Sequence, residues 1–270
     1  MTFHPRRNWQ DMTTAEFAAL DAERLIAILP VAAIEQHGPH LPVSVDATLN
    51  QGILERAWQI MPEHLPVTTL PLLSIGKSPE HQGFPGTLSL SAETLIRLWT
   101  EVGESVARVG VRKMLIFNSH GGQPEIMNIV ALDLRVRLKM LVVKLSWFGP
   151  GIPAGLFTPE EEKHGIHAGA IETAMMLHLD PEHVQIEKAK TFGSSRADYE
   201  QEYLFYRPKS GVGFGWAAQD LHPSGACGDP TTATAEQGEK VVDHAARVLI
   251  QVLEDMDRYP LDLLRDPPLQ

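Results

Sequence analysis

Four short apolar runs along the chain predict buried β-strands. Each run is apolar at nearly every position and rich in β-branched side chains, which is typical of strands that are covered on both faces. The runs span residues 25–34, 66–73, 111–117 and 140–146. A sheet built from such strands must have both of its faces buried.

Between and after these runs, apolar residues recur at helical spacing. The clearest pattern covers residues 92–109, where Leu95, Trp99 and Val106 lie on one stripe and Gly110 follows as a stop signal. The same kind of pattern predicts further helices over residues 47–61, 124–138, 168–178 and 234–256. Capping-box spacing marks two helix starts, at Thr158 with Glu161 and at Thr234 with Gln237.

The alternation of strand and helix patterns predicts an α/β fold. Strands that alternate with helices are typical of a largely parallel sheet with helices on both faces. We expect a single domain over residues 1–270. The segment from about 190 to 233 is the least regular part of the chain, and we interpret it as an insertion or lid within that domain.

The composition is that of a soluble globular protein and narrows the classes of partner. The chain has 270 residues, 43% of them hydrophobic, and a net charge of −11, which disfavours binding to nucleic acid. The single cysteine, Cys227, excludes an intrachain disulfide and a thiolate metal cluster. We see no secretory signal, and the longest apolar run is too short to cross a membrane. We therefore expect a cytoplasmic protein with no membrane contact.

Residues with metal-binding side chains follow the first predicted strand. Glu35 and His37 lie two residues apart, which places both side chains on one face of an extended chain. Asp46 comes after a loop shaped by proline and glycine, which can fold back toward them. Because ligands of parallel sheets bind beyond the carboxyl ends of the strands, these three residues are candidates for a functional site.

Two later runs add more histidine and glutamate side chains. His120 directly follows the third predicted strand, and we expect Gly121 and Gly122 to let the backbone turn sharply there. His167 and Glu172 come later and are five residues apart, which separates them by about 140° on a regular helix. These two can share a site only if His167 lies in the loop before the helix.

Imidazole and carboxylate groups in this combination are typical ligands of Zn²⁺ or Mn²⁺. The candidate ligands are Glu35, His37, Asp46, His120 and Glu172. One catalytic zinc needs only three protein ligands, whereas a carboxylate that bridges would accommodate a pair of ions with a nucleophilic hydroxide between them. Taken singly, each of these residues is more often a capping or solvated surface residue. The prediction therefore depends on their joint placement at one edge of the sheet.

Several runs resemble the creatininase (creatinine amidohydrolase) family, in the family's order along the chain. They are Glu35-Gln-His37-Gly-Pro-His40-Leu-Pro with Asp46, His81-Gln-Gly-Phe-Pro-Gly-Thr87, Asn118-Ser-His120-Gly-Gly122, His167-Ala-Gly-x-x-Glu172-Thr173 and a closing run from Gly228 to Gly238. The first run is quite specific, whereas the histidine followed by two glycines would be weak evidence alone. The resemblance implies an α/β fold, namely a three-layer αβα sandwich with a mostly parallel central sheet.

The resemblance also implies an activity and a set of roles. It implies a metal-dependent amidohydrolase that cleaves a C–N bond in a small, often cyclic amide through a metal-bridging hydroxide. Two divalent ions per subunit would be held by the five candidate ligands, with Zn²⁺ and Mn²⁺ expected and Fe²⁺ as a further candidate. Asp46 matches the bridging position, His167 a position that handles protons or steadies the substrate, and Glu172 a position in the catalytic centre. A homo-oligomer, with a hexamer as a candidate, is implied by the resemblance alone.

One difference from creatininase itself leaves the substrate open. Creatininase carries a glutamate ligand two residues after the histidine that His120 matches, and here that position is Gly122. The two-glycine form resembles other branches, which include formamide deformylases and a peptidase that acts on a modified peptide. An alternative of another class is a non-catalytic relative that binds a metal or a ligand. The complete ligand set disfavours it, because a structural site needs fewer groups.

Other residues are candidates for contacts with substrate or for supporting roles. His81 is a candidate substrate-binding residue, although a structural hydrogen bond to its loop is as plausible, and Trp147 and Trp216 are candidates to stack on substrate or to lie in the core. His40, close to two prolines, is more typical of a residue that fixes the loop. The run from Gly211 to Gly215 has the look of a dinucleotide fingerprint but no preceding strand, which disfavours nucleotide binding.

Overall fold

The computed structural model describes residues 6–205 and 212–266, and this part of the chain contains one sheet of four parallel strands. The strands are β1 (Ile26–Val31), β2 (Val67–Thr69), β3 (Lys113–Asn118) and β4 (Leu141–Ser146). They lie in the order β2-β1-β3-β4. The parallel sheet predicted from the four apolar runs is confirmed. The second run forms a much shorter strand than predicted, because the chain leaves the sheet after Thr69 and returns only as an isolated bridge between Leu73 and Val31.

Nine α-helices surround the sheet in the part of the chain that the structure describes. They are α1 (Thr14–Ala19), α2 (Val45–Ile60), α3 (Ala92–Arg108), α4 (Pro124–Leu138), α5 (Pro159–His164), α6 (Ala170–Leu179), α7 (Ser195–Glu202), α8 (Ala218–Leu221) and α9 (Ala235–Arg258). The five helices expected from periodicity are all present. The short helices α1, α7 and α8 were not predicted, because so few residues show too little periodicity.

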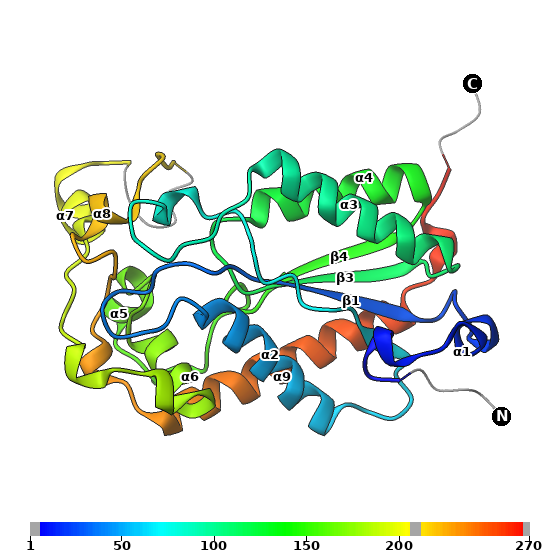
Figure 1. Cartoon of the computed structure of the whole chain (residues 1–270), viewed down its shortest axis with the longest axis horizontal. Helices are drawn as coiled ribbons and strands as arrows, with labels where there is room; N and C mark the ends of the chain where they lie inside the picture. Colours follow the sequence, from blue (N-terminus) through cyan, green and yellow to red (C-terminus); the bar gives the residue numbers. More distant parts are fainter. Residues whose placement is uncertain (1–5, 206–211, 267–270) are drawn as a thin grey trace.

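Helices α3 and α4 cover one face of the sheet, and α2, α6 and α9 lie on the other (Figure 1). Ile26 and Ile28 of β1 pack into a core with α2, α6 and α9, whereas Ala27 and Leu29 pack into a second core with α3 and α4. This alternation follows from the two-residue period of a strand. β1 and β3, in the middle of the sheet, are buried at every position, as predicted. The prediction of a buried strand is wrong for most of β4, because this strand lies at the sheet edge: only Leu145 is buried there, and Lys144 is exposed. The three-layer αβα architecture implied by the resemblance is confirmed.

The register of the strands brings three chain segments to one edge of the sheet. Val31 is paired with Asn118, and Asn118 is paired with Ser146, so β1, β3 and β4 end level with one another. The next strand along the chain, β2, pairs with one side of β1, whereas β3 pairs with the other side. A reversal of this kind opens a crevice beyond the carboxyl ends of the two strands, which is where parallel α/β proteins bind their ligands.

The described parts of the irregular segment, residues 190–205 and 212–233, lie at this same end of the molecule, where Figure 1 shows α7 and α8. A backbone pairing of Cys227 with His167 ties this segment to the rest of the fold, and a pairing of Phe192 with Gly228 joins its two ends. Its role as a lid stays a prediction. None of the helices in the described ranges is long and apolar enough to cross a membrane.

The start of α5 differs from the capping box that its spacing predicts. The Thr158 hydroxyl accepts a hydrogen bond from the Glu161 backbone N–H at 3.1 Å, as expected of an N-cap. The Glu161 side chain does not return to Thr158. It accepts hydrogen bonds from the backbone N–H groups of Ala170 at 2.5 Å and Asp229 at 2.8 Å. A buried carboxylate therefore ties the beginning of α6 to the chain segment that follows Cys227.

Candidate metal centre

The five candidate ligands converge in two overlapping groups of three side chains. One group contains Glu35, Asp46 and His120, the other contains His37, Asp46 and Glu172, and within each group the ligand atoms lie within 4.8 Å of one another. Asp46 belongs to both groups. Its Oδ2 lies 3.3 Å from Nδ1 of His120, and its Oδ1 lies 3.8 Å from Nε2 of His37. The two oxygens of one carboxylate thus face two different groups.

Different elements deliver these side chains to the crevice. Glu35 and His37 lie on the loop after β1, and Asp46 lies in the first turn of α2. His120 follows β3, and its backbone is held by Asn118, whose Oδ1 accepts from the His120 N–H at 3.0 Å and whose Nδ2 donates to the His120 carbonyl at 2.7 Å. Glu172 lies in the first turn of α6. The ligands are therefore distant in sequence but meet at the switch point of the sheet.

Backbone carbonyl groups fix the protonated nitrogen of both histidines. The His37 Nδ1 lies 3.0 Å from the Glu35 carbonyl, and the His120 Nε2 lies 2.9 Å from the Lys77 carbonyl. A carbonyl oxygen only accepts, so each of these nitrogens must be the one that carries the hydrogen. The lone pairs of His37 Nε2 and His120 Nδ1 therefore face the carboxylates. Histidines that bind metals are commonly oriented by such a hydrogen bond.

The carboxylates strongly perturb one another and His120. Burial opposes ionisation of Glu35, but His120, His81 and His167 outweigh it and lower the pKa of Glu35 well below its usual range. Burial and the adjacent Glu35 raise the pKa of Asp46 well above its usual range. Burial disfavours the charged form of His120, yet the two carboxylates prevail and raise the pKa of its imidazole. The carboxylates thus require a positive charge beside them.

The donor set fits divalent cations. Within the described part of the chain, His37 Nε2 and Asp46 Oδ2 are buried and have no hydrogen-bond partner. The lone pair on His120 Nδ1 faces Glu35 Oε1 at 3.2 Å, a contact that a proton or a metal cation must relieve. Nitrogen and oxygen donors of this kind suit Zn²⁺ and Mn²⁺, and a shared carboxylate suits a pair of ions.

Comparison with known proteins agrees with the geometry. Residues 10–253 match the model of the Creatininase family, described as creatinine amidohydrolase. The chain belongs to the creatininase family. "Mycofactocin precursor peptide peptidase" of Mycobacterium tuberculosis is 32% identical over 221 residues, which cover 79% of this chain and 78% of the relative. "3-dehydro-scyllo-inosose hydrolase" of Thermotoga maritima is 27% identical over 277 residues, which cover 97% and 87%. The chain is a hydrolase of this family.

Solved creatininases share the fold. "Creatininase Mn" superimposes with a TM-score of 0.75 at 21% identity, covering 94% of this chain and 100% of that chain. A creatininase variant of the "Zn-Zn type" superimposes with a TM-score of 0.76 at 22% identity, with the same coverage. Mn and Zn, the metals named for these creatininases, form divalent ions, and the clustered donors of the present chain could bind such ions.

Gly122 stands where the resemblance to creatininase implies a glutamate ligand, and the structure gives a reason for glycine there. A Cβ at this position would lie 1.9 Å from Glu80 Oε1 and 2.4 Å from His120 Nε2, so a side chain here would force the Glu80 carboxylate and the His120 ring to move. Neither Gly121 nor Gly122 has a positive φ. The chain does turn at these two glycines, as expected, but the turn needs no left-handed residue, so the structural reason for glycine at position 122 is space.

His167 lies in the loop before α6, which is the arrangement that allows it to share a site with Glu172. Its Nδ1 lies 3.8 Å from Glu35 Oε1, and its ring lies 4.2 Å from that of His37 between centroids. Ala168 has a φ of 54°, unusual for a residue with a side chain, and its N–H donates to Glu172 Oε2 at 2.6 Å. Such strain is often found at functional sites. The roles of His167 and Glu172 in catalysis stay predictions.

The loop before α3 contributes residues that sequence reasoning missed. The Ser78 hydroxyl donates to Glu35 Oε2, the Lys77 carbonyl orients His120, and Glu80 Oε1 lies 3.7 Å from His120 Nε2. No spacing pattern connects these residues to the ligands, because the loop reaches the site only by folding back along the sheet edge. Proximity in sequence to His81 was the one available signal.

The candidate substrate-binding residues occupy different surroundings. His81 is 3% exposed, and its Nε2 lies 3.6 Å from Glu35 Oε1, within the site. Trp147 lies in the core beside β4, and Trp216 is half-buried between α7 and α8. Contacts of these residues with substrate stay predictions. His40 donates or accepts a hydrogen bond at 3.0 Å with Thr173 Oγ1, next to Glu172, which agrees with a loop-fixing role.

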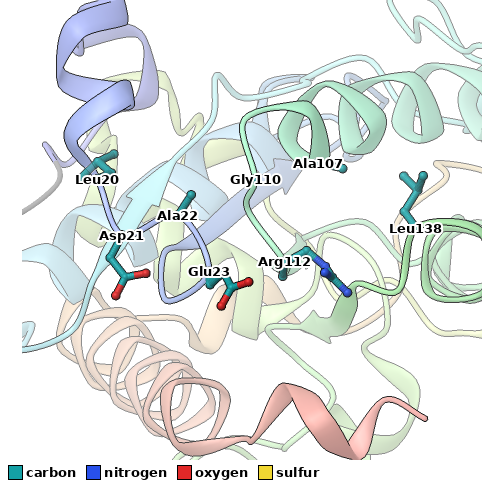
Figure 2. Close-up of a pocket in the computed structure, with 8 residues that line it drawn as sticks. All are labelled: Leu20, Asp21, Ala22, Glu23, Ala107, Gly110, Arg112 and Leu138. Atoms are coloured by element: carbon teal, nitrogen blue, oxygen red, sulfur yellow. The ribbon is translucent and has the colours of Figure 1, made fainter. Parts of the chain in front are cut away.

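The cavity at the other end of the sheet lacks the histidine side chains of the candidate metal centre. A cavity of about 590 Å³ lies at the opposite edge of the sheet, before the amino ends of β1 and β3, and Figure 2 shows its lining by Asp21, Glu23 and Arg112 among others. Arg112 donates to the Lys139 carbonyl at 3.2 Å. The cavity has no histidine among its lining residues. Gly211, the first residue of the glycine-rich run, lies outside the described residues.

Proposed function

We propose that this protein is an amidohydrolase that uses two divalent metal ions. Glu35 and His120 would hold one ion, His37 and Glu172 would hold the other, and Asp46 would bridge them. The observation that carries the proposal is the placement of Asp46, whose two oxygens face His120 and His37 separately. A carboxylate shared in this way is typical of two-metal hydrolytic sites.

The metal ions, when bound, would polarise a substrate carbonyl group and lower the pKa of water. The chain itself supplies proton handling through His167. Burial, followed by the neighbouring His37, lowers the pKa of His167 to about 4, so its imidazole is neutral near pH 7. The Nε2 of His167 lies 2.7 Å from the Gln36 carbonyl and carries the hydrogen, which leaves a lone pair on Nδ1. His167 can therefore accept a proton from water at Nδ1 and return it to the leaving nitrogen.

The burial of the site supports a small amide group as the part of the substrate that reacts. Glu35, His37 and Asp46 are 1–2% exposed, whereas the Glu172 side chain is 15% exposed and the His167 side chain 10%. Solvent and substrate would thus approach from the side of Glu172 and His167. A cyclic amide or a formamide is small enough to reach the carboxylates past them.

A peptide substrate is the second candidate. It is favoured by the 32% identity to a peptidase of a precursor peptide, and by Gly122 in place of the glutamate of creatininase. A peptide end can reach a partly covered site in the same way as a small amide. The same metal centre would serve either substrate.

Metal analysis combined with a hydrolysis screen tests the proposal. Purified protein is assayed by elemental analysis and with cyclic amides, formamides and short peptides, before and after treatment with a chelator. We expect about two divalent ions per chain, loss of both ions in Asp46→Asn, and recovery of activity when Zn²⁺ or Mn²⁺ is returned to the chelated wild type. Asp133→Asn, which changes an acidic residue on the surface of α4, is the control and should retain metal and activity. Full activity without divalent metal would contradict the proposal.

A further inference from the structure

We propose that Gln36 is a positioning residue that sets the protonated nitrogen of both His81 and His167. In this arrangement His81 directs an N–H group toward Glu35, and His167 directs a lone pair toward the same carboxylate. The inference rests on the proposed function for its catalytic meaning. Its structural content, the location of two ring protons, can be measured without any substrate.

Two backbone groups fix the orientation of the Gln36 amide. The Gly38 N–H donates to the Gln36 Oε1 at 2.9 Å, and the Gln36 Nε2 donates to the Gly225 carbonyl at 2.9 Å. A backbone N–H can only donate and a carbonyl can only accept, so the amide oxygen and nitrogen cannot be exchanged. Gln36 is 5% exposed, which leaves water little access to compete for these bonds.

The fixed amide determines the tautomer of His81. The Gln36 Nε2 lies 2.7 Å from the His81 Nδ1. Because the amide nitrogen is a donor only, His81 Nδ1 must accept, and the ring hydrogen must be on Nε2. The His81 Nε2 is the atom that lies 3.6 Å from Glu35 Oε1.

The backbone of the same residue determines the tautomer of His167. The His167 Nε2 lies 2.7 Å from the Gln36 carbonyl and carries its hydrogen there, so its 3.2 Å contact with the Gln36 Nε2 places two donors together and is not a hydrogen bond. The Gln36 side-chain amide uses one of its two hydrogens on His81 Nδ1 and the other on the Gly225 carbonyl. The His81 and His167 rings stack at 4.2 Å between centroids with an angle of 28°, so the two residues form one unit on Glu35.

This arrangement gives the site one N–H donor and one proton acceptor on the same carboxylate oxygen. If His81 carried its hydrogen on Nδ1, lone pairs of both rings would face Glu35 Oε1, which is unfavourable beside an ionised carboxylate. Gly225 also helps to hold the Gln36 amide in place. Its φ is +78°, and a Cβ there would lie 2.5 Å from the Gln36 Oε1. Both the backbone conformation and the close contact with the Gln36 amide therefore favour glycine at this position.

The substitution Gln36→Glu tests the proposal at nearly constant shape. A carboxylate cannot donate, so His81 should move its hydrogen to Nδ1, whereas His167 should keep its hydrogen on Nε2 because a backbone carbonyl holds it. Ring nitrogens with and without hydrogen resonate far apart in ¹⁵N spectra, and the experiment uses Zn²⁺-loaded protein labelled with ¹⁵N-histidine. The His81 signal is assigned by its loss in His81→Gln.

Gln123→Glu is the matched control. Gln123 is equally buried, and its amide donates to Asn118 Oδ1 at 2.9 Å and touches no imidazole at hydrogen-bond distance among the described residues. It should lose stability as Gln36→Glu does but leave the His81 and His167 ring signals unchanged. Gly225→Ala, which displaces the Gln36 amide, is a second variant that should alter the His81 signal if Gln36→Glu does not fold.

Two outcomes would overturn the proposal. In the first, wild-type His81 carries its hydrogen on Nδ1. In the second, Gln36→Glu or Gly225→Ala leaves the His81 hydrogen on Nε2, in which case any loss of activity would reflect structure alone. With a hydrolysed substrate in hand, Gln36→Glu should lower kcat about 10- to 100-fold at unchanged metal content. Because the ring signals do not depend on substrate, they remain decisive even if the protein proves not to be an amidohydrolase.

Discussion

Replacing Gly122 with alanine should weaken metal binding, although it adds only one methyl group. The new Cβ would lie 2.4 Å from His120 Nε2, about 1 Å short of an ordinary contact of 3.4 Å. The His120 ring must move by a similar distance, which breaks its 2.9 Å hydrogen bond to the Lys77 carbonyl. Nδ1 on the same rigid ring then leaves its place beside Glu35 and Asp46.

The size of this effect can be estimated from comparable metal sites. Disturbing a group that orients a ligand costs about 10- to 100-fold in metal affinity, which corresponds to about 1.4–2.8 kcal/mol. We therefore expect Gly122→Ala to raise the dissociation constant for Zn²⁺ by this factor. The measurement is a competition titration of metal-free protein against a chromophoric chelator at fixed pH.

The neighbouring glycine provides the control. A Cβ on Gly121 would meet nothing within 4 Å, so Gly121→Ala should bind Zn²⁺ as the wild type does. The double variant Gly122→Ala with Glu80→Ala removes the 1.9 Å contact but not the contact with His120, so it should recover little affinity. Equal affinities of the two single alanine variants would refute the reasoning. A full recovery in the double variant would show that Glu80, and not His120, limits the space.

Three further predictions address the ligands, the proton and the loop. Asp46→Asn should abolish the stabilisation of the fold by Zn²⁺, which for the wild type amounts to about 2.7 kcal/mol when the free Zn²⁺ concentration is about 100 times the dissociation constant. Equal shifts of melting temperature on addition of Zn²⁺ to both proteins would argue against Asp46 as a shared ligand. His167→Ala should retain its metal content while turnover falls about 10²- to 10⁴-fold, and full turnover would remove His167 from the reaction. Burial lowers the pKa of His40 to about 4 from 6.5, so between these pH values the unfolded chain binds a proton that the folded chain does not, and stability falls as the pH falls. His40→Gln should remove up to about 3 kcal/mol of this loss in the free energy of unfolding. The measurement is urea unfolding of metal-free protein at pH 7 and pH 4.5. The same pH dependence in both proteins would count against a buried neutral His40.

Sequence periodicity predicted the secondary structure of the layers well. The long helices α3 and α9 bury one face each, so their apolar stripes and caps were sufficient to place them within two residues. The central strands β1 and β3 were recognisable because a strand covered on both faces is mostly apolar. The run that forms β4 was recognised as a strand, but its largely half-buried state follows from its place at the sheet edge, which the local pattern does not report. The three short helices α1, α7 and α8 could not be predicted, because four to eight residues depend on packing and not on a repeating pattern.

The sequence by itself determined which side chains could bind metal, since Glu35, His37, Asp46 and His120 stand next to strand ends and the helices that follow. Only the tertiary structure decided how they are used. It directs the two oxygens of Asp46 to different groups, brings Glu80 and the Lys77 carbonyl to His120, and makes the Gln36 amide a partner of His81. The physical reason is that local pattern reports which side of an element is buried, whereas the direction of a lone pair depends on backbone groups that reach it from elsewhere in the chain.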